Sequence, residues 1–286
     1  MKFKLAQLRF RRKFGVELEF TQSSTDRNKL CTAIRSVGEP AYIDGFVHNH
    51  NNEEWCCKTD SSCGYEAASR VFSTPQELKK AGEAIDAIRT AGAKVNNRCG
   101  FHVHIELDDF NESKLGKLAA WWVKIEGMII NSVPTARKAN NYCIPLTQYF
   151  RPDTAYSAEQ VLREARSHGR YMTLNLANWY DRKTIEFRIA EGTDDSATVK
   201  NWVRFLLWFI EKTKKLDMPE NINWLFPDEM FETFGLTGYS PSQDTFYVFS
   251  CGVAEMRHWI LNRISKYARH HDDKNLAKHF IREQYS

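Results

Sequence analysis

The sequence predicts an α+β fold in which a largely antiparallel sheet is backed by helices. Several short segments alternate apolar and polar residues, which is the period of a strand with two different faces. Longer segments between them carry apolar residues at helical spacing behind capping residues. Strands and helices follow one another irregularly rather than as repeated strand–helix pairs, which favours antiparallel pairing. The 286 residues, 42% of them hydrophobic, suffice for one large domain or two small ones.

Three segments show the clearest strand pattern, namely residues 14–20 (FGVELEF), 101–107 (FHVHIEL) and 184–190 (TIEFRIA). In each of them apolar residues occupy alternate positions and a pair of polar residues occupies the opposite face. The polar pairs are Glu17 with Glu19, His102 with His104, and Glu186 with Arg188. We also expect strands at 42–47, 55–58 and 170–179, where the alternation is shorter or less regular.

Helices are expected between these strands. The segment 75–91 begins with a capping box of Thr74 and Glu77, has Pro75 at its first position, and ends at Gly92. Other predicted helices cover 111–133, 158–169 with Ser157 as N-cap, 194–216 and 252–271. We therefore predict a first domain over 1–213 and a C-terminal, mainly helical extension over 214–286 that packs on it.

Composition limits the classes of function. Lys and Arg number 40 against 36 Asp and Glu, a net charge of +4 without a long basic block. This balance gives no strong indication of nucleic-acid binding, but it is compatible with polyanionic substrates such as nucleotides. An odd number of cysteines, 7, is scattered along the chain, and neither a signal peptide nor a membrane span is evident. We expect a cytoplasmic protein that does not bind a membrane.

The carboxylate pair is the most informative of the polar pairs. Residues two apart on one face of a strand lie roughly 7 Å from each other. At an effective dielectric constant near 20, charges on Glu17 and Glu19 would repel by about 2 kcal/mol. A cation nearby would remove that cost. Oxygen ligands suit Mg²⁺, added imidazole favours tolerance of Mn²⁺, and the closely spaced cysteine pairs of zinc sites are missing from the pattern.

The segments FGVELEF, CGFHVHI and TIEFRIAEGT, in that order, resemble the signature segments of the amidoligase family, within the glutamine synthetase-like carboxylate–amine ligases. Two segments between them, WCCKTDSSCGYEAAS and GRYMTLNLAN, also resemble segments of that family. The resemblance covers residues 13–212. It implies a glutamine synthetase-like fold, in which a curved, largely antiparallel sheet receives a nucleotide and metal ions on its polar, concave face.

The resemblance also implies a reaction and its partners. ATP would phosphorylate a carboxylate to an acyl phosphate, and an amine would then displace the phosphate to form an amide. The expected cofactors are ATP and Mg²⁺ or Mn²⁺, with two metal ions. An amino acid, a peptide or a modified nucleotide would be a suitable substrate class for the carboxylate and the amine.

Motif positions carry metal-binding roles over to five residues. Glu17, His102 and Glu186 resemble the ligands of the metal nearest the ATP phosphates. Glu19 and Glu66 resemble the ligands of a second metal, near the acceptor carboxylate. All five residues come from segments that the sequence predicts as strands or as their neighbours.

Catalytic roles are carried over in the same way. Arg188 resembles the arginine that binds the transferred phosphoryl group, because a planar fork of donors suits phosphate oxygens. Arg170 and Asn175 resemble residues that assist it. Asp60 matches a further acidic position more loosely. His104 shares the face of His102 and is expected to support the ligands or contact a substrate.

Three other functions remain open from the residues. A phosphotransferase on the same fold would release a phosphorylated acceptor rather than an amide. A metal-dependent hydrolase or nuclease would cleave a bond without ATP. A non-catalytic nucleotide-binding protein would not need the complete set of charged residues on the three strands.

Overall fold

The computed structural model describes most of the chain, and these residues form two compact units. The described ranges are 12–44, 52–138, 140–223 and 253–268, with residues 225, 229–230, 233–234, 274–275 and 277–278. The sheet unit contains the described residues up to Asp108 and Asn178–Val203. The helical unit contains Asp109–Ala177 and the described residues from Arg204 onward. The predicted boundary between a domain over 1–213 and an extension over 214–286 stays a prediction.

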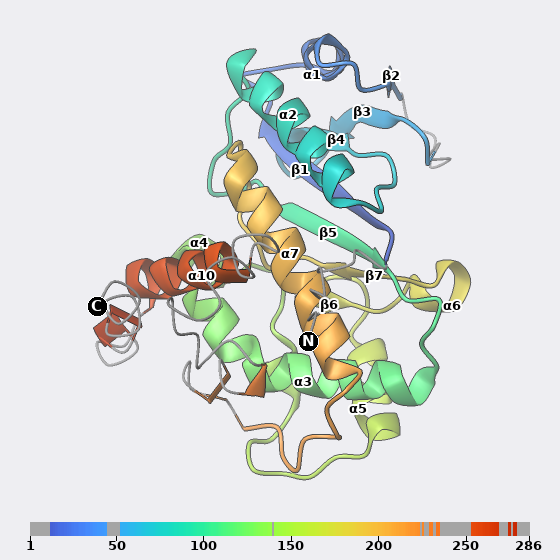
Figure 1. Cartoon of the computed structure of the whole chain (residues 1–286), viewed down its shortest axis with the longest axis vertical. Helices are drawn as coiled ribbons and strands as arrows, with labels where there is room; N and C mark the ends of the chain where they lie inside the picture. The colour runs from blue at the N-terminus through green and yellow to red at the C-terminus, as the bar shows by residue number, and fades with distance from the viewer. Residues whose placement is uncertain are drawn as a thin grey trace, which may run out of the picture. The chain divides into compact units, whose positions relative to one another are not determined.

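The sheet unit is built on six strands in the order β2-β3-β4-β1-β5-β7 (Figure 1). Their bounds are β1 Phe14–Thr21, β2 Ala41–Ile43, β3 Trp55–Asp60, β4 Gly64–Ala68, β5 Phe101–Glu106 and β7 Thr184–Phe187. Neighbouring strands with a defined register are antiparallel, except β2 and β3, which are parallel. The predicted α+β class with a largely antiparallel sheet is therefore confirmed. Residues 45–47 of the strand expected at 42–47 lie outside the described residues.

One face of this sheet is a continuous apolar surface. Val16 of β1 lies opposite Val103 of β5, and Val103 in turn lies opposite Phe187 of β7. Leu18 lies between Phe101 and β4 in the same way, and all of these side chains are buried. Because side chains alternate along each strand, this register puts the polar residues of all these strands on the other face.

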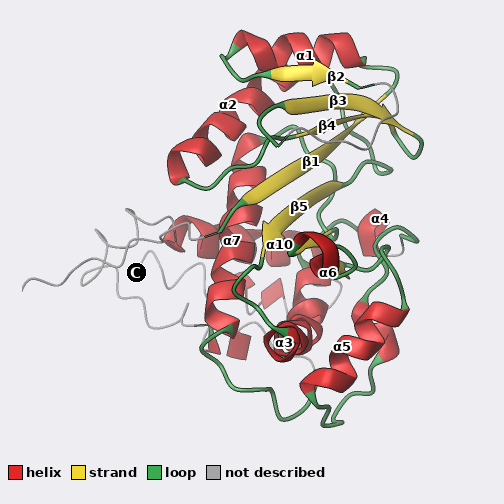
Figure 2. Ribbon diagram, turned by 90° about the vertical axis from the view of Figure 1, so that its right-hand side faces the viewer, coloured by secondary structure: helices red, strands yellow, loops and turns green. Residues whose placement is uncertain are grey.

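Helices α1 (Arg27–Ser36) and α2 (Pro75–Thr90) belong to the same unit as the strands. In Figure 1, α2 lies in front of β1 and β4, and in Figure 2, turned by 90°, it lies to one side of them. Helix α1 contacts β2, β3 and β4, and its Cys31 and the Cys57 of β3 are both fully buried. These helices therefore exclude water from the apolar side of the sheet.

The two helices differ in how readily the sequence predicts them. The capping box of Thr74 and Glu77 is present at the start of α2, and Gly92 follows its end with a φ of 91°. Helix α1 was not predicted, because its few apolar residues are interrupted by polar ones. Its N-cap is Asp26, whose carboxylate accepts a hydrogen bond from the amide of Lys29.

The helical unit contains α3 (Glu112–Asn131), α4 (Thr135–Lys138), η1 (Leu146–Tyr149), α5 (Ala158–Ser167), β6 (Leu174–Asn175) and α10 (Val253–Tyr267). Helix α7 (Ser196–Thr213) begins in the sheet unit. Helices α3 and α5 approach closely at Gly116, where a β-carbon would lie 2.0 Å from the carbonyl oxygen of Ala158. Among the described residues, no helix is long and apolar enough to cross a membrane.

The strand expected over 170–179 is wrong in its length, since only the two residues of β6 are extended in a ladder. Thr173 and Asn175 of this segment are both buried. The Thr173 hydroxyl donates a hydrogen bond to the buried Glu126 carboxylate, which also accepts from the Trp122 indole. A network of polar partners inside the unit thus permits burial on both sides of this segment.

The start of α2 is joined to the end of β4 by ion pairs around Arg70. Arg70 Nε lies 2.8 Å from Glu39 Oε2, and its Nη1 lies 2.8 Å from Glu77 Oε1. Burial opposes ionisation of Glu77, but hydrogen bonds from Arg70 and from the capping turn outweigh it and lower the pKa of Glu77 to about 2. The carboxylate form of Glu77 is therefore favoured in the folded chain.

This shift predicts how the stability of the sheet unit depends on pH. A folded-state pKa below the usual 4.5 means that the contribution of Glu77 is present above pH 4.5 and is lost as the pH falls toward about 2. We expect Glu77→Gln to reduce the slope of the free energy of unfolding between pH 5 and 3, measured by urea denaturation. Glu83→Gln, on an exposed pair with Lys79 of the same helix, is the control. An unchanged slope in Glu77→Gln would contradict the assignment.

Candidate active site on the polar face of the sheet

Charged residues from four strands meet on the polar face of the sheet. Glu17 of β1 lies directly opposite His102 of β5. Glu19 of β1 lies opposite Glu66 of β4, and His104 of β5 lies opposite Glu186 of β7. Side chains of directly opposite residues lie within reach of each other. The register therefore brings residues far apart in sequence into one continuous group.

The first group, here called the histidine cluster, consists of Glu17, His102 and Glu186. His102 Nδ1 lies 3.3 Å from Glu17 Oε2 and 3.3 Å from Glu186 Oε1. Each residue offers one ligand atom, and these atoms all lie within 4.8 Å of one another. The Arg188 guanidinium contacts the Glu186 carboxylate. The structure thus brings together the residues expected to bind the first metal and the arginine expected to bind a phosphoryl group.

The second group, here called the carboxylate cluster, consists of Glu19, Asp60 and Glu66. Their ligand oxygens also lie within 4.8 Å of one another. Asp60 ends β3, and its Oδ1 accepts hydrogen bonds from the amides of Ser62 and Cys63 in the turn before β4. This turn explains why the loosely matched Asp60 lies beside the two predicted ligands.

His102 lies between the two clusters. Its Nδ1 faces Glu17 and Glu186, whereas its Nε2 lies 3.8 Å from Glu19 Oε1. The amide of Gly100, just before β5, donates a hydrogen bond of 2.6 Å to Glu19 Oε2. Movement of β5 would therefore affect both clusters together.

Charge compensation on this face is shared between protons and basic side chains. Burial opposes ionisation of Glu17, but His104 and His102 outweigh it and hold the pKa of Glu17 well below its usual value. Burial disfavours the charged form of His104 too, yet Glu17 and Glu186 raise its pKa to about 9. Burial and the charge of Glu17 raise the pKa of Glu66 to about 8. The basic side chains of His104 and Lys58 thus lie beside carboxylates whose ionisation burial opposes.

The donor atoms suit a hard divalent cation. Carboxylate oxygens with one imidazole nitrogen are ligands that Mg²⁺ and Mn²⁺ accept. Glu66 Oε1 is buried and, among the described residues, receives no hydrogen bond, although Lys58 Nζ lies 2.8 Å away. His104 Nε2 is buried without a hydrogen bond from the described residues, although it lies 3.2 Å from Glu17 Oε1. The face therefore has more binding capacity than its own side chains use.

Two predicted catalytic residues belong to the other unit. Arg170, in the helical unit, donates a hydrogen bond from its guanidinium to the hydroxyl of Tyr171. Asn175 lies in β6, and its side-chain oxygen accepts a hydrogen bond from the amide of Ala177. Their catalytic roles, and the ligand roles of the sheet residues, stay predictions.

Sequence reasoning missed Lys58, the basic residue of the carboxylate cluster. Lys58 lies directly opposite Glu66 on neighbouring strands, with 2.8 Å between Nζ and Oε1. Burial would lower the pKa of Lys58, but Glu66 and Glu17 raise it above its usual value, so the ammonium stays charged. Its alternation with Cys57 in β3 indicates the polar face. Only the pairing of β3 with β4, however, reveals its partner.

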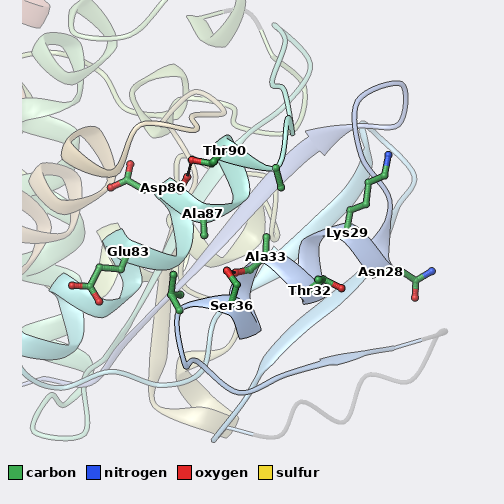
Figure 3. Close-up of a pocket in the computed structure, with 11 residues that line it drawn as sticks. Asn28, Lys29, Thr32, Ala33, Ser36, Glu83, Asp86, Ala87 and Thr90 are labelled. Atoms are coloured by element: carbon green, nitrogen blue, oxygen red, sulfur yellow. Dashed lines mark hydrogen bonds between the residues drawn. The ribbon is translucent and has the colours of Figure 1, made fainter.

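A separate pocket of about 750 Å³ lies between α1 and α2 (Figure 3). Its lining includes Lys29, Thr32, Glu83 and Asp86, and no predicted site residue contributes to it. The side chains come from the exposed sides of two helices, and the charges among them do not converge on one point (Figure 3). We therefore place the candidate active site on the polar face of the sheet.

The family comparison agrees with the residues that the sequence segments singled out. Residues 10–210 match the model of the family described as "Putative amidoligase enzyme". This match covers well over half of the chain, and the chain therefore belongs to that family. The family description supports an amide-bond-forming ligase. No curated protein matches the sequence.

Two solved structures are similar to the chain at low identity. A bifunctional glutathione synthetase from Pasteurella multocida matches with a TM-score of 0.42 and 9% identity, over 98% of this chain and 48% of the synthetase. The complex of the prokaryotic ubiquitin-like protein Pup and its ligase PafA matches with a TM-score of 0.36 and 9% identity, over 96% of this chain and 65% of that one. The chain thus spans about half the length of the synthetase chain and just under two thirds of the length of the other chain.

The alternation in β5 separates stability from ligand binding. Val103→Ala removes buried apolar contacts, and we expect it to lower the free energy of unfolding by roughly 1–3 kcal/mol while Mn²⁺ binding is retained. His102→Ala removes a side chain from between the clusters, and we expect at least about tenfold weaker Mn²⁺ binding with little loss of stability. Urea denaturation and calorimetric titration of Mn²⁺ measure both effects. Exchanged phenotypes would show that the two faces of β5 are assigned the wrong way round.

Proposed function

We propose that this protein is an ATP- and Mg²⁺-dependent ligase that joins a carboxylate to an amine through an acyl phosphate. The observation that carries the proposal is the histidine cluster with Arg188 against its Glu186. Carboxylates and a guanidinium around one point suit a phosphoryl group that is accompanied by a metal ion. Membership of the amidoligase family supports the same reaction class.

The histidine cluster would hold the metal nearest the ATP phosphates, through Glu17, His102 and Glu186. A divalent ion there supplies charge neutralisation for the phosphate oxygens and for the transferred group. The three side chains come from adjacent strands, so the sheet fixes their spacing before the nucleotide binds. Without a cation, Glu17 and Glu186 would repel the phosphates.

Arg188 would bind the transferred phosphoryl group. Its contact with Glu186 orients the guanidinium along the polar face rather than into solvent, and its side chain is only 14% exposed. A planar fork can bind two phosphate oxygens while neighbouring ligands occupy the others. A surface ion pair would not need the buried carboxylates that surround this arginine.

The carboxylate cluster would hold the second metal, near the acceptor. In the proposed reaction, an oxygen of the substrate carboxylate attacks the γ-phosphorus, and ADP leaves as the bond to its β-phosphate oxygen breaks. The amine nitrogen then attacks the acyl carbon, the carbon–oxygen bond to phosphate breaks, and the amine loses a proton. The chain's own contribution is to place two anionic reactants beside each other on one buried face.

Binding of ATP by the isolated protein tests the central part of this proposal. We expect ATP affinity, measured by calorimetry, to fall at least about a hundredfold when EDTA replaces Mg²⁺, because uncompensated carboxylates face the phosphates. Glu17→Gln should weaken binding in Mg²⁺ and lessen the effect of EDTA.

Glu106→Gln serves as the matched control, because Glu106 ends the neighbouring strand β5 but pairs with the exposed Lys13. This variant should bind ATP like the wild type. Equal ATP affinity of the wild type in Mg²⁺ and in EDTA would contradict the proposal.

A further inference from the structure

The carboxylate cluster already contains a cation, the Lys58 ammonium. Lys58 Nζ lies 2.8 Å from Glu66 Oε1. The Glu66 side chain is 7% exposed, whereas the Lys58 side chain is 28% exposed. Lys58 therefore forms a close ion pair with Glu66, and part of its side chain reaches solvent.

A buried group of carboxylates needs such a charge when no metal is bound. Glu19, Asp60 and Glu66 converge within 4.8 Å, and Glu66 lies near Glu17 as well. Leaving one buried carboxylate without a partner is strongly destabilising. Lys58 lies directly across from Glu66 on the neighbouring strand, which is the position from which a lysine side chain reaches it.

The same position makes Lys58 a competitor of a metal ion. A divalent cation bound by the three carboxylates would use the Glu66 oxygen that Lys58 contacts. The divalent cation and the Lys58 ammonium would then lie close together, and they would repel each other because little solvent screens their charges. A lysine has a flexible four-carbon chain, and Lys58 is partly exposed, so its ammonium can move outward at small cost.

We infer that Lys58 is a displaceable internal counter-ion, which occupies the carboxylate cluster until a divalent cation displaces its ammonium from Glu66. This inference rests on the second metal site of the proposed function. A divalent ion must displace the Lys58 ammonium to bind at the carboxylate cluster, so we expect the ion there to bind in the weaker of two steps.

Titration of the whole protein with Mn²⁺ tests the inference, with calorimetry to measure affinity and electron paramagnetic resonance to count free ions. In Lys58→Met, which keeps length but removes charge, we expect the weaker binding step to strengthen by about tenfold or more and the stronger step to stay within about twofold. Lys58→Arg keeps the charge, and its weaker step should remain at least as weak as in the wild type. Lys13→Met, which removes an exposed lysine of the same unit, should leave both steps unchanged.

Thermal unfolding gives a second readout that does not depend on activity. Lys58→Met should melt at a lower temperature than the wild type in EDTA, because the carboxylates lose their counter-ion, and saturating Mn²⁺ should restore most of the difference. If the methionine variant does not fold, Lys58→Gln replaces it in both measurements. A variant that stays less stable in Mn²⁺ by the same amount as in EDTA would overturn the inference.

The outcomes separate this inference from the function on which it rests. If the wild type binds two ions and removal of the Lys58 charge leaves the weaker step unchanged or weaker still, the counter-ion role is overturned and the ligase proposal is untouched. If the wild type binds one ion and Lys58→Met gains a second, the inference is supported. If neither protein binds Mn²⁺, both the inference and the metal-dependent function are overturned.

Discussion

The structure of the sheet unit depends on compensation of buried carboxylates on one face of a sheet whose other face is the core. The period of two that buries Val16, Leu18 and Val103 necessarily places Glu17 and Glu19 on the opposite face. The strand pairing then adds further acids opposite them. The register that buries the apolar residues therefore brings carboxylates close together on the polar face. Their mutual repulsion must be compensated by the residues around them.

The compensation of the carboxylates differs between the histidine cluster and the carboxylate cluster. Around Glu17, His102 Nδ1 lies 3.3 Å and His104 Nε2 lies 3.2 Å from its carboxylate oxygens, and the pKa of Glu17 is held well below its usual value despite burial. Around Glu66, compensation comes from Lys58, which lies directly opposite on the neighbouring strand, while burial and Glu17 raise the pKa of Glu66. A bound divalent ion would replace these basic side chains as the partner of the carboxylates and would interact with them more strongly.

Local patterns predicted the strands at 14–20 and 101–107 and the capping box of α2, because alternation and caps depend on nearby residues. The same patterns did not predict α1, where polar residues interrupt the apolar stripe. They also failed over 170–179, where the hydrogen-bond partners of Thr173 come from α3. The residues of the histidine cluster could be named from motifs, but their proximity follows from strand pairing. Lys58 could not be assigned a role from sequence, since its partner Glu66 is known only once β3 and β4 are paired.

The most direct test of the account is a mass-spectrometric screen of the purified protein with MgATP, ¹⁸O-labelled carboxylates and a library of amines. The account predicts an amide, ADP, and inorganic phosphate that carries ¹⁸O, because the labelled carboxylate oxygen stays on phosphorus when the acyl phosphate is displaced. An amide formed with unlabelled phosphate would contradict the acyl-phosphate route. A phosphorylated acceptor without an amide, or bond cleavage without ATP, would contradict the assignment as a ligase.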